Sequence, residues 1–201
     1  MIGSAPMTGT DWVAIDVETT GLSPERDRIV EIGLVRFDPQ GREIGSWATI
    51  LDPGRDPGPT EIHGIRPADI AGAPRFDQVA HELVWRLGGA RLIAHNAGFD
   101  RGFLVAELGR VGSDWSAARL VCSMRASRHA GIGPRNTLGA CCAALGIANP
   151  AAHSALADAR AAGQVLMALL PRLRGYRELD APAAPWAPAP GRLAVTRTRG
   201  R

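Results

Sequence analysis

Three runs of residues near the start of the chain alternate apolar and polar positions, and this pattern predicts β-strands. The runs cover residues 12–18, 28–37 and 42–51. Short turns that contain Pro or Gly separate them, which favours an antiparallel meander. Further strands are predicted at 90–95 and 120–124, where strands begin to alternate with helices. The order of elements predicts an α/β fold with helices packed on a mixed sheet.

Apolar residues elsewhere recur at helical spacing. Helices are predicted at 76–87, at 101–112 with Asp100 as the N-cap, at 136–146, and after Ser154, a residue type that often caps helices. The last of these helices carries Asp158 in its first turn or just past it. His153 is five residues earlier, about 140° away on a continuous helix, so it must precede the helix on a loop.

The length of 201 residues, 45% of them hydrophobic, predicts one globular domain. We expect a flexible N-terminus over 1–10, a folded domain over 11–179, and a disordered tail over 180–201 that is rich in Pro, Ala and Arg. The N-terminus resembles no signal peptide, and no apolar run is long enough to span a membrane. Three cysteines, two of them adjacent, fit small buried residues in a cytoplasmic protein: Cys122, Cys141 and Cys142.

The charge of the chain is divided unevenly between body and tail. All 23 basic residues are Arg, and the formal net charge is +3. Four of the arginines follow Asp180, whereas residues 1–179 hold 19 Arg and 19 acidic residues. The body is therefore formally neutral, and the basic isoelectric point is only weak evidence that it binds nucleic acid.

The first predicted strand, in the segment DWVAIDVETTGLS, carries two acids. Alternation places Asp16 and Glu18 on the face opposite Val13, Ile15 and Val17. Two carboxylates about 4 Å apart repel by roughly 4 kcal/mol at an effective dielectric constant near 20, so the pair needs cations, protons or water. A strand face exposed to solvent would show the same alternation, so the pair of acids alone does not distinguish a cation site from a solvated face.

Two further segments supply acids and a histidine. HNAGFD brings Asp100 to the end of the fourth predicted strand, and HSALADA brings His153 and Asp158 to a helix start. Taken singly, Asp100 fits a helix cap and His153 a surface residue. Four converging carboxylates would be costly without cations. Hard ions such as Mg²⁺ take oxygen ligands, and a pair of ions can stabilise a phosphoryl displacement while histidine removes a proton from water.

The motifs DVETTGL, HNAGFD and HSALADA, in this order, resemble those of the DEDDh (DnaQ-like) 3′-5′ exonuclease family. The segments 61–79 and 136–147 are similar to connecting parts of the same family. The resemblance covers roughly residues 12–173. It implies an RNase H-like fold, a five-stranded mixed sheet flanked by helices.

The resemblance also implies roles for individual residues. Four acids would hold two Mg²⁺ or Mn²⁺ ions, with His153 as the general base: Asp16, Glu18, Asp100 and Asp158. Other positions match those that contact or support the terminal nucleotide: Thr19, Leu22, His63, Asn96 and Phe99. Glu31 matches a family position that is usually structural.

The implied activity is hydrolysis of terminal phosphodiesters at a 3′ end with release of nucleoside 5′-monophosphates. The TTGL sequence resembles the DNA-acting proofreading branch of this family more than its oligoribonuclease branch, which implies DNA rather than RNA. Single-stranded DNA is the expected partner, with a DNA polymerase or repair protein as a second one. Two alternatives remain open. One is a binding module of the same fold that has lost catalysis, although all five site residues are present. The other is a phosphatase with Asp16 as nucleophile, which usually has a second Asp where Glu18 stands and would leave His153 unused.

Overall fold

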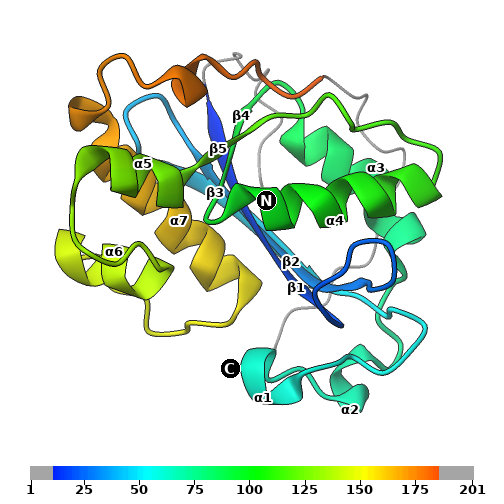
Figure 1. The fold of residues 1–201 in the computed structure, drawn as a ribbon. Coiled ribbons are helices and arrows are strands. Elements are labelled where there is room, and N and C mark those ends of the chain that lie inside the picture. The colour runs from blue at the N-terminus through cyan, green and yellow to red at the C-terminus, as the bar shows by residue number, and fades with distance from the viewer. Residues whose placement is uncertain (1–10, 186–201) are drawn as a thin grey trace.

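The computed structural model describes residues 11–185, which form a five-stranded mixed sheet in the order β3-β2-β1-β4-β5 (Figure 1). The first three strands pair antiparallel, whereas β1 with β4 and β4 with β5 pair parallel. The strands are β1 (Trp12–Thr19), β2 (Ile29–Phe37), β3 (Glu43–Ile50), β4 (Arg91–Ala94) and β5 (Leu120–Cys122). The predicted fold class, a meander continued by parallel strands, is confirmed.

Helices cover both faces of the sheet (Figure 1). One core lies between the sheet and the helices α3 and α4, and a second lies between the sheet and α5, α6 and α7. The helices are α1 (Thr60–His63), α2 (Pro67–Ile70), α3 (Phe76–Leu87), α4 (Ala97–Arg110), α5 (Ser123–Ala130), α6 (Leu138–Leu145) and α7 (Ala155–Leu169), with 3₁₀ turns η1 (Leu170–Arg172) and η2 (Arg177–Asp180).

Helix α7 lies directly against β1 and β2, because Gly163 has no side chain at the contact. A Cβ atom at Gly163 would lie 2.2 Å from Cε2 of Phe37 and 3.1 Å from Cβ of Ala14. From this contact the helix runs back toward its N-terminus over the later part of β1. The start of α7 therefore reaches the end of β1 that carries the two acids.

Two predicted boundaries near the motifs are wrong. Helix α4 begins at Ala97 rather than Arg101, because Asn96 adopts a left-handed conformation (φ 61°) and turns the chain into the helix directly after β4. Asp100 is therefore inside the first turn and is not the N-cap. The strand predicted at 120–124 ends at Cys122, where α5, a helix that the sequence did not indicate, begins.

The packed body extends beyond the predicted boundary at residue 179. Ala184 is buried, its N–H donates to the carbonyl of Ala90 over 2.8 Å, and its own carbonyl accepts from Gly89. Residues 1–10 and 186–201, which hold the expected N-terminus and most of the expected tail, lie outside the described residues. The three cysteines are free and buried, as predicted. Within residues 11–185, no helix has both the length and the apolar character required to cross a membrane.

Candidate active site

The face of β1 that meets α7 changes from apolar to acidic side chains along the strand. Trp12 and Ala14 on this face belong to the core beneath α7, and the next two side chains on the same face are Asp16 and Glu18. The opposite face stays apolar along the strand, as predicted. Because α7 begins near Asp16, the acids occupy the part of the strand that the helix no longer covers, and both are half-buried.

Asp158 enters the same region from the first turn of α7. Its Oδ2 atom accepts a hydrogen bond from the backbone N–H of His153 over 3.0 Å, and its Oδ1 atom accepts one from Nδ2 of Asn149 over 2.6 Å. Ser154 is the N-cap residue, as predicted, although its side chain makes no capping bond. The loop before α7 is therefore folded onto Asp158, which places His153 beside this carboxylate on an exposed loop.

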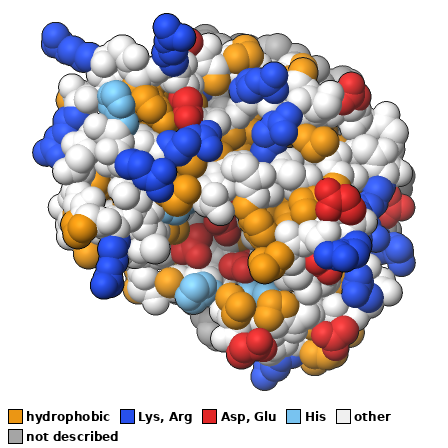
Figure 2. Space-filling model, in the orientation of Figure 1, with side chains coloured by type: hydrophobic (Ala, Val, Ile, Leu, Met, Phe, Trp, Pro, Cys, Tyr) orange, Lys and Arg blue, Asp and Glu red, His pale blue; other side chains and the backbone are white. Residues whose placement is uncertain are grey.

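Three carboxylates form a cluster with the geometry of a cation site. One oxygen from each of Asp16, Glu18 and Asp158 lies within 4.8 Å of the others. Figure 2 shows a hollow in the surface with acidic side chains at its floor and hydrophobic and histidine side chains along its rim. Oxygen ligands that converge in a hollow suit hard divalent cations such as Mg²⁺ or Mn²⁺.

Asp100 approaches β1 from the side of β4. Strand β4 ends at Ala94 and leaves the N–H of Val17 without a strand partner, and Oδ1 of Asp100 accepts from it over 3.3 Å. Asp100 is 2% exposed and is not one of the three clustered carboxylates. Its negative charge nevertheless acts on Asp16, more strongly than that of any other residue. The structure thus gathers three predicted ligands closely and sets the fourth beside them.

The electrostatics of the site favour cations or protons. Burial raises the pKa of Asp16 well above its usual range, and the charges of Asp100, Glu18, Asp158 and Glu31 raise it further. Burial also raises the pKa of Asp100 to about 7, against the opposing effect of backbone N–H donors. A bound cation would reverse both shifts because it stabilises the ionised carboxylates.

The two motifs that follow β4 and precede α7 share a backbone feature. Asn96 (φ 61°) and His153 (φ 67°) are the non-glycine residues of positive φ within residues 11–185. Residues held in this conformation cost free energy and cluster at functional sites. Each of the two comes just before the helix that carries an acid of the site, so the turns bring Asp100 and Asp158 toward β1.

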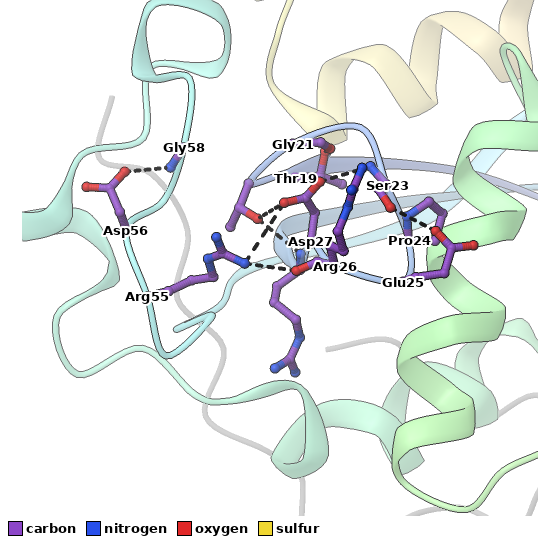
Figure 3. A network of polar contacts seen from close by, with 12 residues as sticks. Thr19, Gly21, Ser23, Pro24, Glu25, Arg26, Asp27, Arg55, Asp56 and Gly58 are labelled. Atoms are coloured by element: carbon purple, nitrogen blue, oxygen red, sulfur yellow. Dashed lines mark hydrogen bonds and ion pairs between the residues drawn. The ribbon is translucent and has the colours of Figure 1, made fainter.

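The loop between β1 and β2 directly follows the strand that carries Asp16 and Glu18, and Figure 3 shows the polar contacts that hold it. Leu22 is 84% exposed, whereas Thr19 is buried and its hydroxyl donates to the carbonyl of Gly21 over 2.7 Å. Asp27 holds the loop from inside by accepting from the N–H of Ser23 and the hydroxyl of Thr20. An exposed leucine on a fixed loop offers a contact surface for a flat apolar group such as a nucleobase.

Two further residues singled out from the sequence are buried or partly buried. His63 is 2% exposed, and its Nδ1 atom accepts from the N–H of Ile65 over 3.1 Å. The neighbouring Ile62 is 55% exposed. Phe99 packs on the core against Phe103, with ring centroids 5.0 Å apart. His63 and Phe99 thus fix local structure, whatever contact they make with a ligand.

Sequence reasoning missed two residues that position the site. Asn149 binds Asp158, and Asp27 shapes the loop that carries Leu22. Both lie in irregular segments without periodicity, and their partners depend on the folded loop. The composition NPAAH before the helix indicates a turn, but it does not indicate which side chain faces Asp158.

Residues 13–166 match the exonuclease family RNase_T, so the chain belongs to this family and the predicted membership is confirmed. The chain is 32% identical over 173 residues to the DNA polymerase III subunit epsilon of Escherichia coli, covering 80% of this chain and 71% of that protein. A DNA polymerase III subunit epsilon-like protein of Rhodobacter capsulatus is 34% identical over 180 residues, covering 86% and 25%. The chain spans about a quarter of the Rhodobacter protein and of a relative from Mycobacterium tuberculosis.

Solved structures confirm the RNase H-like fold. A structure of exonuclease I superposes with a TM-score of 0.70 at 22% identity and covers 83% of this chain and 43% of that one. The Escherichia coli exonuclease I in complex with a dT13 oligonucleotide gives a TM-score of 0.69 at 23% identity, covering 85% and 43%. The family, its relatives and the acidic cluster together support a nuclease function that uses divalent metal.

Proposed function

We propose that the chain is a 3′-5′ exonuclease of the DEDDh type, which hydrolyses the terminal phosphodiester of single-stranded DNA and releases nucleoside 5′-monophosphates. The observation that carries this proposal is the cluster of Asp16, Glu18 and Asp158 within 4.8 Å, with His153 bonded to Asp158 through its backbone. The name of the epsilon relatives and the oligonucleotide bound by exonuclease I support DNA as the substrate.

The donor set fits two divalent ions. All four acids offer oxygen ligands. Burial raises the pKa of both Asp16 and Asp100, and the charges of neighbouring carboxylates raise that of Asp16 further. Asp16, Glu18, Asp100 and Asp158 would hold the ions, with Mg²⁺ or Mn²⁺ as the expected elements. When bound, the ions supply Lewis-acid stabilisation of the attacking and leaving oxygens.

The residues of the chain would then orient the substrate and move one proton. His153, exposed beside the cluster, takes a proton from the attacking water as the P–O bond to the 3′ oxygen of the preceding nucleotide breaks. Asp158 holds the loop of His153 in place through the backbone bond. Leu22 packs against the terminal base, and Thr19, His63, Asn96 and Phe99 shape the pocket around it.

Hydrolysis of end-labelled single-stranded DNA and RNA tests the proposal. With Mg²⁺ or Mn²⁺, we expect stepwise shortening from the 3′ end, faster on DNA, that stops with EDTA. His153→Ala should lower turnover about 10²- to 10⁴-fold, the usual contribution of a general base. His81→Ala, an exposed histidine on α3, is the matched control and should be as active as the wild type.

Three results would contradict the proposal. Shortening from the 5′ end would show that the enzyme has the opposite polarity. Undiminished activity of His153→Ala would show that His153 is not the general base. A complete lack of hydrolysis by the wild type with either metal, while the chain still binds the oligonucleotide, would identify the catalytically inactive binding module. Cytoplasmic localisation and a polymerase or repair partner remain predictions.

A further inference from the structure

Residues 1–179 carry no formal net charge, but their acidic and basic residues are distributed unevenly along the sequence. No Asp or Glu occurs between Asp114 and Asp158, and four arginines lie in this interval: Arg119, Arg125, Arg128 and Arg135. We call residues 119–135 the arginine segment; it includes β5, α5 and the start of the loop to α6. Figure 2 shows basic side chains gathered over α5 and β5, above the acidic hollow.

His95 ties the start of α5, within the arginine segment, and the residue just after the segment to the edge of the candidate active site. Its Nδ1 atom lies 2.9 Å from Oγ of Ser123, the first residue of α5, and its Nε2 atom lies 2.9 Å from the carbonyl oxygen of Asn136. Burial lowers the pKa of His95, and the negative charge of nearby Asp158 opposes that shift. The start of α5 and the residue just after the segment are therefore held at His95, near Asp158.

The arginines of the segment differ in what they contact. Arg125 forms an ion pair with Glu178, and Arg119 donates to backbone carbonyls of residues 116–118. Arg128 and Arg135 are exposed, and within residues 11–185 neither forms an ion pair. Their charges are thus available to an anionic partner.

We propose that the arginine segment, through Arg128 and Arg135, binds phosphates of a single-stranded nucleic acid on the 5′ side of its terminal nucleotide. The proposal rests on the proposed function, which places the 3′ end in the hollow. A single-stranded nucleic acid that leaves this hollow over α5 meets cationic and neutral side chains. The arginine segment presents no carboxylate to it. Two phosphate contacts of this kind add affinity that depends on strand length and on salt.

Fluorescence anisotropy with the full chain tests this surface. The probes are labelled single-stranded oligonucleotides of about 3 and about 12 nucleotides with phosphorothioate linkages at the 3′ end to slow hydrolysis. The variant Arg128→Ala/Arg135→Ala is compared with Arg75→Ala/Arg172→Ala, which removes the same charge at exposed positions at the start of α3 and beyond the far end of α7.

We expect the Arg128→Ala/Arg135→Ala variant to weaken binding of the longer strand more than that of the shorter one. Loss of two phosphate contacts should make the slope of log K against log salt concentration shallower by about 1.4. When the salt concentration is raised fourfold, the affinity of the variant should therefore fall by a factor about seven times smaller than that of the wild type. The control variant should keep the wild-type slope.

Equal slopes and equal affinities for the variant and the wild type would overturn the proposal, as would an equal loss in the control variant. Hydrolysis of the p-nitrophenyl ester of thymidine 5′-monophosphate, which has no upstream phosphate, reports separately on the hydrolytic site. If the wild type binds the oligonucleotides with the expected salt dependence but does not hydrolyse the ester, the proposed function is wrong. The proposed binding of phosphates by the arginine segment would still hold.

Discussion

Glu31 on β2 accepts a hydrogen bond from the backbone N–H of Ala155, the first residue of α7, over 3.0 Å. Glu31 is 3% exposed and faces Glu18 directly across the ladder between β1 and β2. The first N–H groups of a helix have no partner inside it, and a negative charge at this end is favourable. The bond therefore fixes the start of α7, and with it Asp158, relative to the acids of β1.

This bond predicts a difference between two substitutions of Glu31. Glu31→Ala leaves a buried N–H without its acceptor and should lower the free energy of unfolding by about 1–3 kcal/mol. Glu31→Gln keeps an acceptor oxygen and should cost less. Thermal denaturation in EDTA measures both, with about 2–4 °C expected per kcal/mol for a chain of this size. An alanine variant as stable as the wild type would show that the bond contributes nothing.

Gly33 predicts a second effect at the same contact. A Cβ atom there would lie 2.2 Å from the carbonyl carbon of Ala155, which is backbone and must shift. Gly33→Ala should therefore destabilise the protein by about 1–3 kcal/mol or more and reduce hydrolysis, since α7 carries Asp158. Gly109→Ala makes the same change inside α4 with nothing within 4 Å, and it should be neutral or stabilising by up to about 1 kcal/mol. Equal free energies of unfolding for Gly33→Ala and Gly109→Ala would show that Gly33 and α7 are not in close contact.

The raised pKa values of Asp16 and Asp100 predict a pH dependence of the metal-free protein. Both carboxyls bind protons more tightly when folded than when unfolded, so stability falls as the pH rises above the ordinary Asp value. For Asp100 this fall continues to about pH 7. The pKa shift of Asp100 alone corresponds to a loss on the order of 4 kcal/mol.

Asp100→Asn isolates the contribution of one carboxyl. In EDTA, the substitution should stabilise the protein near neutral pH and have a much smaller effect near pH 4, measured by denaturant titration at each pH. Saturating Mg²⁺ should reverse the effect, because the ions stabilise the ionised carboxylate of the wild type. The same change in stability at both pH values would show that the pKa of Asp100 is not raised.

The sequence predicted the parts of the site that depend on local pattern. Alternation in β1 put Asp16 and Glu18 on one face, and the five-residue separation put His153 on a loop before the helix of Asp158; the structure has both. The start of α4 was mispredicted because Gly98 and the left-handed Asn96 weaken the helical pattern around HNAGFD. Contacts that join distant segments carry no local signal, as with Glu31 and Ala155.

The proposed activity depends on the binding of two divalent ions by four carboxylates, those of Asp16, Glu18, Asp100 and Asp158. Calorimetric titration of the full chain with Mn²⁺, in the presence of thymidine 5′-monophosphate, measures this binding directly. We predict two ions per chain for the wild type and loss of binding in Asp16→Ala, whose side chain belongs to the cluster. Binding of no Mn²⁺ by the wild type, or undiminished binding by Asp16→Ala, would show that these carboxylates do not hold the ions.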